Sequence, residues 1–161
     1  MSTLVLGMGN PILSDDGLGL VVARRLSELP MPSDVEVAES EVGGLRLLEL
    51  VRGFTKVVII DALASGREPG EIRRVDGDEF RGGHRYGSAH SIHLGTALEL
   101  GHRLGYDMPA EVVVYTAEAV DVETFGEGLS APVARAADQL VELVAEELRT
   151  GVAPAALAAP A

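Results

Sequence analysis

Two patterns of apolar residues alternate along the chain. Residues 3–9, 56–60 and 112–116 are apolar almost throughout, which is typical of strands buried on both faces of a sheet. Over residues 16–29 and 130–148, apolar residues instead recur every three or four positions, the spacing of one face of a helix. The two patterns predict three buried strands and two amphipathic helices.

Weaker patterns complete the predicted order of elements. Residues 35–38 and 71–75 predict two further strands, residues 44–51 and 90–104 predict two further helices, and the glycine-rich residues 77–90 predict a loop. Strands that alternate with helices favour a mainly parallel sheet with helices on both faces. The predicted fold class is α/β: a three-layer α/β/α sandwich around a mainly parallel, twisted sheet of about five strands.

Length and composition limit the kind of domain. The 161 residues suit one domain, predicted to cover residues 1–150. Residues 151–161 are rich in alanine and proline, and we expect this low-complexity tail to be disordered. No run approaches the roughly 18 apolar residues that span a bilayer, and the first residues lack the basic start of a signal peptide. We therefore expect a cytoplasmic protein without a membrane partner.

Charge and cysteine content exclude several classes of function. The formal net charge is −12 at pH 7, which disfavours a nucleic-acid partner because phosphates are bound mainly by Lys and Arg. The chain contains no cysteine. Disulfides, thiolate metal sites and a cysteine nucleophile are therefore excluded.

Acidic residues follow three of the predicted strands, at 10–16, 39–44 and Asp61. Sites in parallel sheets form at the carboxyl ends of the strands. The first of these segments begins with the glycines of a dinucleotide-binding turn. However, Ile12 stands where the third glycine belongs, Pro11 lacks an N–H group, and two aspartates would repel a pyrophosphate. These departures disfavour nucleotide binding.

The two adjacent aspartates cannot both face the same partner, since neighbouring residues diverge by about 100° on a helix. Ser14 or Asp15 can cap the following helix, while Asp16 faces the edge of the sheet. Asp61 is the natural partner of Asp16, although a role in a turn explains a single aspartate equally well. Two aspartates and an imidazole from separate segments suit a divalent transition metal with open coordination positions. His90 and His93 are the candidate imidazoles, and each alone is more often structural.

Together these motifs resemble those of the [NiFe]-hydrogenase maturation endopeptidases. The family opens with G-x-G-N and then D-[DE]-G-x-G, which the segments GMGN (7–10) and DDGLG (15–19) match. VVIIDAL (57–63) matches its second acidic strand, PGEIRRVD (69–76) the following turn and strand, and SAHSIHLG (88–95) its S-x-H motif. The resemblance extends in order over about residues 3–150.

The resemblance implies a function and a set of site residues. Family members remove a C-terminal extension from the hydrogenase large-subunit precursor after nickel insertion, by metal-assisted hydrolysis of one peptide bond. The implied nickel is carried by the precursor, so the endopeptidase can rest metal-free. The residues carried over are Asp16, Asp61 and His90 as catalytic and metal-contacting residues, and Gly7, Gly9 and Asn10 as the structural turn.

A segment linked to substrate choice departs from the family pattern. The family often shows an acid followed by G-G-T-x-G, whereas this chain has ESEVGG at residues 39–44. Glu39, Gly43 and Gly44 are the predicted substrate-binding residues, and the hydrogenase that would be processed stays open. Two other functions also stay open: a non-catalytic metal- or nucleotide-binding domain, and a metallopeptidase of the same fold with another peptide substrate.

Overall fold

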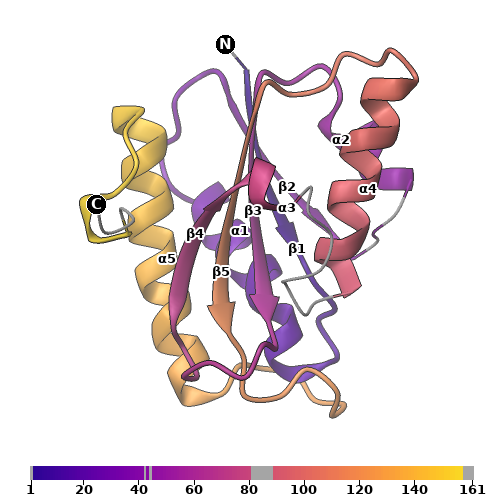
Figure 1. Cartoon of the computed structure of the whole chain (residues 1–161). Helices are drawn as coiled ribbons and strands as arrows, with labels where there is room; N and C mark the ends of the chain where they lie inside the picture. The colour runs from indigo at the N-terminus through magenta and orange to yellow at the C-terminus, as the bar shows by residue number, and fades with distance from the viewer. Residues whose placement is uncertain (1, 42, 44, 81–88, 158–161) are drawn as a thin grey trace.

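The computed structural model describes residues 2–41, 43, 45–80 and 89–157, and for residues 78, 80 and 89–93 the backbone alone. A five-stranded sheet in the order β2-β1-β3-β5-β4 forms its centre (Figure 1). Strand β4 is antiparallel to β5, and the other neighbours are parallel. The strands are β1 (Thr3–Met8), β2 (Val35–Ser40), β3 (Lys56–Leu63), β4 (Ile72–Asp76) and β5 (Glu111–Glu118).

Helices cover both faces of the sheet, which confirms the three-layer sandwich (Figure 1). Helices α1 and α5 pack on one face, and α2 and α4 pack on the other. None of the described helices is both long and apolar enough to cross a bilayer. The helical elements are η1 (Ser14–Gly17), α1 (Leu18–Ser27), α2 (Leu45–Val51), α3 (Gly77–Phe80), α4 (Ala89–Arg103), α5 (Ala131–Thr150) and η2 (Ala155–Leu157).

The central strand β3 shows why residues 57–60 are all apolar. Val57 and Ile59 belong to the core on the side of α2 and α4. Val58 and Ile60 belong to the core on the side of α1 and α5. Because successive side chains of a strand point to opposite faces, a strand between two helical layers needs an apolar residue at every position.

Several predicted boundaries differ in the structure. Strand β3 does not end at Asp61 but continues to Leu63, since β5 pairs with it as far as Glu118. Asp61 therefore lies within the strand. Residues 77–80, predicted as loop, form the short helix α3, while residues 81–88 lie outside the described part of the chain.

The chain after α5 turns back onto the domain. Gly151 ends α5 in the left-handed conformation that glycine favours. Pro154 is buried, and Leu157 in η2 packs against the core on the α1 and α5 side. Residues 154 and 157 thus lie against the domain, while the disorder expected for residues 151–161 stays a prediction. Residues 158–161 lie outside the described residues.

Candidate functional site

The turn after β1 is built by glycines that permit close backbone packing. A Cβ atom on Gly7 would lie 2.2 Å from the carbonyl oxygen of Gly19, and one on Gly9 would lie 1.9 Å from that of Asp16. A Cβ atom on Gly19 would lie 2.3 Å from the carbonyl oxygen of Ile60. The space beside these glycines is filled by the protein's own backbone, so the turn does not form an open cradle for a phosphate.

The same packing brings Asp16 and Asp61 to one edge of the sheet. Asp16 lies in η1, the first helical element after β1, and η1 contacts β3. Its side chain is 8 % exposed, and its Oδ2 accepts a hydrogen bond from the Asn10 N–H at 3.0 Å. Asp61 is 4 % exposed, and its Oδ1 accepts from the Ala62 N–H at 2.9 Å. Two buried carboxylates therefore occupy neighbouring segments at the carboxyl edge.

The predicted third ligand is placed only in part. His90 is the second residue of α4, and its side chain lies outside the described part of the structure, as does that of His93. Among the described residues, no group of three or more histidines and carboxylates is placed to hold a metal ion. The grouping of His90 with the two aspartates stays a prediction.

The first residue of the predicted substrate-binding segment lies inside a strand, not in the loop after it. Glu39 lies within β2 rather than after it. Both of its carboxylate oxygens accept from the Nε–H group of Arg24 at 3.0 Å. Gly43 is half-buried beyond the strand, and Gly44 lies outside the described residues.

Asp15 holds a distant segment rather than its own helix, so the predicted capping by Ser14 or Asp15 is wrong. Gly17 is the N-cap of α1, and no side chain caps that helix. Asp15 is 1 % exposed, and its carboxylate accepts from the Val120 N–H at 2.9 Å and from the Ser130 N–H at 2.7 Å. The Ser130 hydroxyl adds a bond at 2.8 Å. Since Ser130 is the N-cap of α5, Asp15 fixes the connection between β5 and α5.

Glu118, at the end of β5, has a similar role that the sequence did not reveal. Its buried carboxylate accepts from the Ser65 N–H at 2.7 Å, the Ser65 hydroxyl at 2.8 Å and the Gly66 N–H at 2.9 Å. Residues 65 and 66 belong to the turn between β3 and β4. Glu118 thus holds this turn beside the end of β3. The residues next to Glu118 in the sequence do not indicate this contact, because its partners lie about 50 positions away.

Four buried acids consequently lie at the carboxyl edge: Asp15, Asp16, Asp61 and Glu118. Each accepts hydrogen bonds from neutral N–H or O–H groups. Neutral donors stabilise carboxylates without cancelling their charge. The arrangement gathers four carboxyl groups at this edge of the sheet, and carboxyl groups gathered in this way favour binding of a cation.

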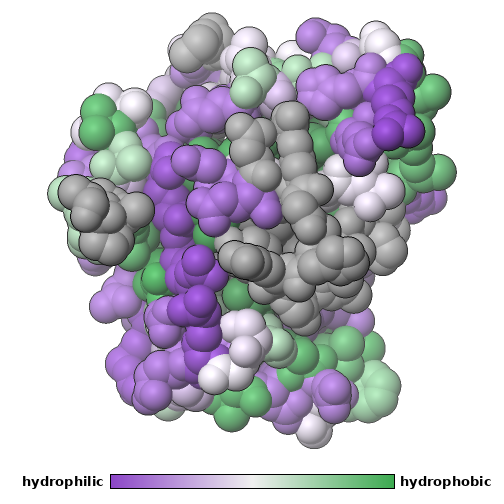
Figure 2. All heavy atoms as spheres, in the orientation of Figure 1, coloured by the Kyte–Doolittle hydropathy of each residue, from purple (hydrophilic) through white to green (hydrophobic). Residues whose placement is uncertain are grey.

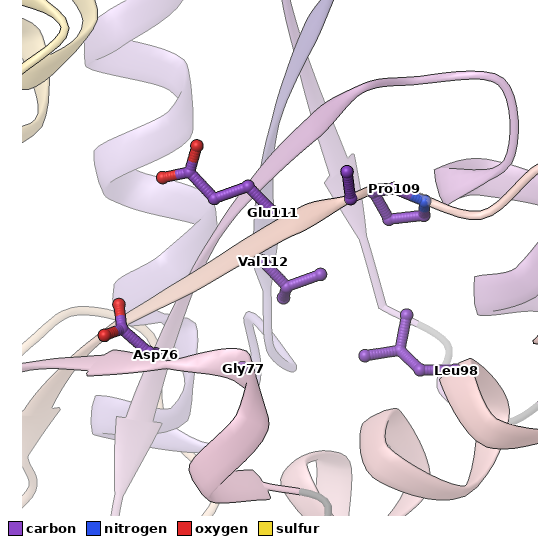
Figure 3. Close-up of a pocket in the computed structure, with 7 residues that line it drawn as sticks. Asp76, Gly77, Leu98, Pro109, Glu111 and Val112 are labelled. Atoms are coloured by element: carbon purple, nitrogen blue, oxygen red, sulfur yellow. The ribbon is translucent and has the colours of Figure 1, made fainter.

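A pocket of about 320 Å³ lies at the opposite, amino edge (Figure 3). Its two carboxylates already have cationic partners: Asp76 pairs with Arg74 at 3.1 Å and Glu111 pairs with Lys56 at 3.0 Å. Leu98 and Val112 supply apolar lining. The pocket lies away from the acids of the carboxyl edge and brings no catalytic group to them.

Comparison with known proteins agrees with this geometry. The family model of the HycI hydrogenase maturation protease matches residues 20–147. The putative hydrogenase maturation protease of Methanocaldococcus jannaschii is 32 % identical over 151 residues, which cover 91 % of this chain and 96 % of that protein.

Solved structures of similar proteins show the same fold. The hydrogenase maturating endopeptidase HybD from Escherichia coli superposes with a TM-score of 0.84 at 25 % identity, covering 94 % of each chain. The [NiFe] hydrogenase maturation protease HybD from Thermococcus kodakarensis has a TM-score of 0.72 at 28 % identity, covering 92 % of this chain and 99 % of that one. The chain therefore belongs to the hydrogenase maturation protease family.

Proposed function

We propose that this protein is an endopeptidase that removes the C-terminal extension of a [NiFe]-hydrogenase large-subunit precursor after nickel insertion. Family membership supports the protease activity and the hydrogenase substrate. The observation that carries the mechanism is the pair of buried carboxylates, Asp16 and Asp61, at the carboxyl edge of the sheet. We place this reaction in the cytoplasm.

The proposed nickel is cargo of the precursor rather than a resident cofactor. Without cysteine, this chain has no thiolate with which to hold nickel tightly. Asp16, Asp61 and His90 would instead complete the coordination of an ion that the precursor presents. Such an ion polarises the scissile carbonyl or lowers the pKa of a bound water.

The protein itself contributes by fixing the orientation of the Asp16 and Asp61 carboxylates before the precursor binds. The Asn10 N–H orients the carboxylate of Asp16, and the Ala62 N–H orients that of Asp61. Because both side chains are buried, little rotamer freedom remains to be lost on docking. Precursor that lacks nickel would bring no cation to these acids, and would gain correspondingly less on docking. That difference in affinity is the physical basis for cleavage only after nickel insertion.

The test compares one precursor in two states, with and without nickel, in the absence of free metal. We expect mass spectrometry to show loss of the C-terminal extension from the nickel-loaded form alone. Asp16→Asn should lower this cleavage at least about a hundredfold, because an amide is a poorer metal ligand than a carboxylate. Its thermal unfolding should stay close to that of the unmodified chain.

Two results would overturn the proposal. Comparable cleavage of the nickel-free precursor would indicate a conventional metallopeptidase that carries its own metal. Full activity in a folded Asp16→Asn variant would show that this carboxylate is not part of the reaction.

A further inference from the structure

The connection between β5 and α5 is a fixed loop beside the candidate site. Residues 120–130 begin and end on Asp15, whose carboxylate accepts from Val120 and Ser130. Between these points the loop is bonded to the turn after β1. The Gly126 N–H donates to the Ile12 carbonyl at 2.9 Å, and the Ser14 N–H donates to the Gly126 carbonyl at 2.9 Å.

The tip of the loop is ordered by its own contacts as well. Asp121 Oδ1 accepts from the N–H groups of Glu123 and Thr124, each at 2.9 Å. Hydrogen bonds with Thr124 and Glu123 lower the pKa of Asp121, so this turn keeps its charge. The Ser14 hydroxyl donates to the Thr124 carbonyl at 2.8 Å. Both neighbours of Phe125 are thereby fixed to the rest of the protein.

Phe125 nevertheless covers no part of the core, since its side chain is 79 % exposed. Exposed Ile12 and Val120 lie on the same two segments, and Ile12 is joined to the residue after Phe125 by a backbone hydrogen bond. We call Ile12, Val120 and Phe125 the edge patch. Figure 2 shows apolar groups among polar ones along the lower edge of the molecule, where the loop lies in Figure 1.

A rigid, exposed aromatic residue is typical of an anchor for another protein. When a partner binds such a residue, little conformational freedom of the loop is lost, so more of the contact energy appears as affinity. The edge patch is continuous with the segment that carries Asp16. A substrate that docks on this patch lies close in the fold to the segment that carries Asp16.

The charges around the patch restrict the chemistry of what it contacts. Glu123 and Glu127 are exposed on the same loop, Asp121 is charged, and the whole chain carries a net charge of −12. Acidic residues around an apolar contact favour a partner with basic side chains around its own apolar surface.

We propose that the edge patch is the docking surface for the folded body of the large-subunit precursor, with Phe125 as anchor against an apolar surface bordered by basic side chains. This inference rests on the proposed function. It assigns the loop 120–130 to substrate recognition and leaves the reaction itself to the buried acids.

The test measures steady-state cleavage of nickel-loaded precursor by Phe125→Ser. We expect KM to rise at least about tenfold, because a large apolar contact is lost, while kcat is unchanged because Phe125 touches no reacting group. Leu104→Ser is the matched control: Leu104 is also exposed, but it follows α4 near the amino edge. It should leave KM unchanged. A double variant, Glu123→Gln with Glu127→Gln, should raise KM about threefold and weaken its dependence on salt.

Direct binding separates docking from catalysis. Isothermal titration of nickel-loaded precursor into the wild-type chain and into Phe125→Ser gives the affinity without requiring cleavage. If the wild type binds but does not cleave, and Phe125→Ser no longer binds, the proposed function fails while the docking surface stands. If Phe125→Ser binds and cleaves like the wild type while melting normally, the docking surface is wrong. A wild-type dimer that Phe125→Ser converts to a monomer, with KM unchanged, would assign the patch to self-association instead.

Discussion

Buried carboxylates occur at both edges of the sheet, and they have different partners. At the amino edge, buried Glu147 accepts from the Nε–H of Arg74 and the ammonium of Lys56, each at 2.9 Å, and from the hydroxyl of Tyr115. At the carboxyl edge, Asp15 and Glu118 accept from backbone N–H groups and serine hydroxyls. Cationic side chains neutralise Glu147, whereas neutral N–H and O–H donors orient Asp15 and Glu118.

The pKa of Glu147 shows the effect of this neutralisation. Burial by itself would raise it, but the hydrogen bonds from Arg74, Tyr115 and Lys56 outweigh burial and lower the pKa to about 2. Because Arg74 and Lys56 already neutralise Glu147, this carboxylate serves the stability of the fold and does not require a cation from a substrate. Neutral donors instead orient Asp15 and Glu118, at the edge that also carries Asp16 and Asp61. The comparison explains why we assign the reaction to the carboxyl edge.

Glu147→Gln should destabilise the protein by disrupting the charge network at the amino edge, and it should not change the reaction. Removing one partner from a buried charge network lowers the free energy of unfolding by about 3 kcal/mol, as urea unfolding at pH 7 would measure. Because folding lowers the pKa of Glu147 from 4.5 to about 2, its contribution is fully present above pH 4.5 and is lost as pH falls through about 2. The variant should therefore lose less stability than the wild type across that range.

Cleavage measured per folded molecule should not change in Glu147→Gln, because the network lies at the far edge of the sheet. A loss of activity without unfolding would show that the two edges are coupled, and would weaken the division drawn between them.

Asp15→Asn and Glu118→Gln sharpen the comparison within the carboxyl edge. In each variant an amide N–H₂ group replaces an acceptor that faces N–H donors, which should cost about 1–3 kcal/mol of stability. Asp15 also fixes the segment that carries Asp16, so Asp15→Asn should lower kcat about tenfold, as for other groups that orient a ligand. Glu118→Gln should keep kcat. Equal kcat in the two folded variants would mean that Asp15 is structural alone.

Glu39→Gln should have the smallest effect on stability. The Arg24–Glu39 ion pair is exposed, and such pairs contribute little to stability because solvent screens them. If Glu39 contacts the precursor, Glu39→Gln should raise KM about threefold. Arg24→Ala removes the same ion pair but keeps the carboxylate, and should leave KM unchanged. Equal KM values for both variants would remove Glu39 from the substrate-binding residues.

The fold was largely predictable because its signals are local. A strand between two helical layers must be apolar at each position, as residues 57–60 are, and a helix on one face must repeat its apolar residues at helical spacing. The position of Asp61 inside β3 was not predictable. The length of β3 depends on its pairing with β5 as far as Glu118, a contact between segments far apart in the chain.

The sequence by itself determined that glycines permit a tight turn after the first strand, that acids follow three of the predicted strands, and that the chain has no cysteine. It could not determine what each acid contacts. Asp15 stands where a helix cap is expected, yet its partners, Val120 and Ser130, lie more than a hundred residues away. Spacing rules concern residues within a few positions of each other. Only the packing of α1 and α5 on the same face of the sheet brings the two segments together, so that the Asp15 carboxylate can bind both ends of the loop 120–130.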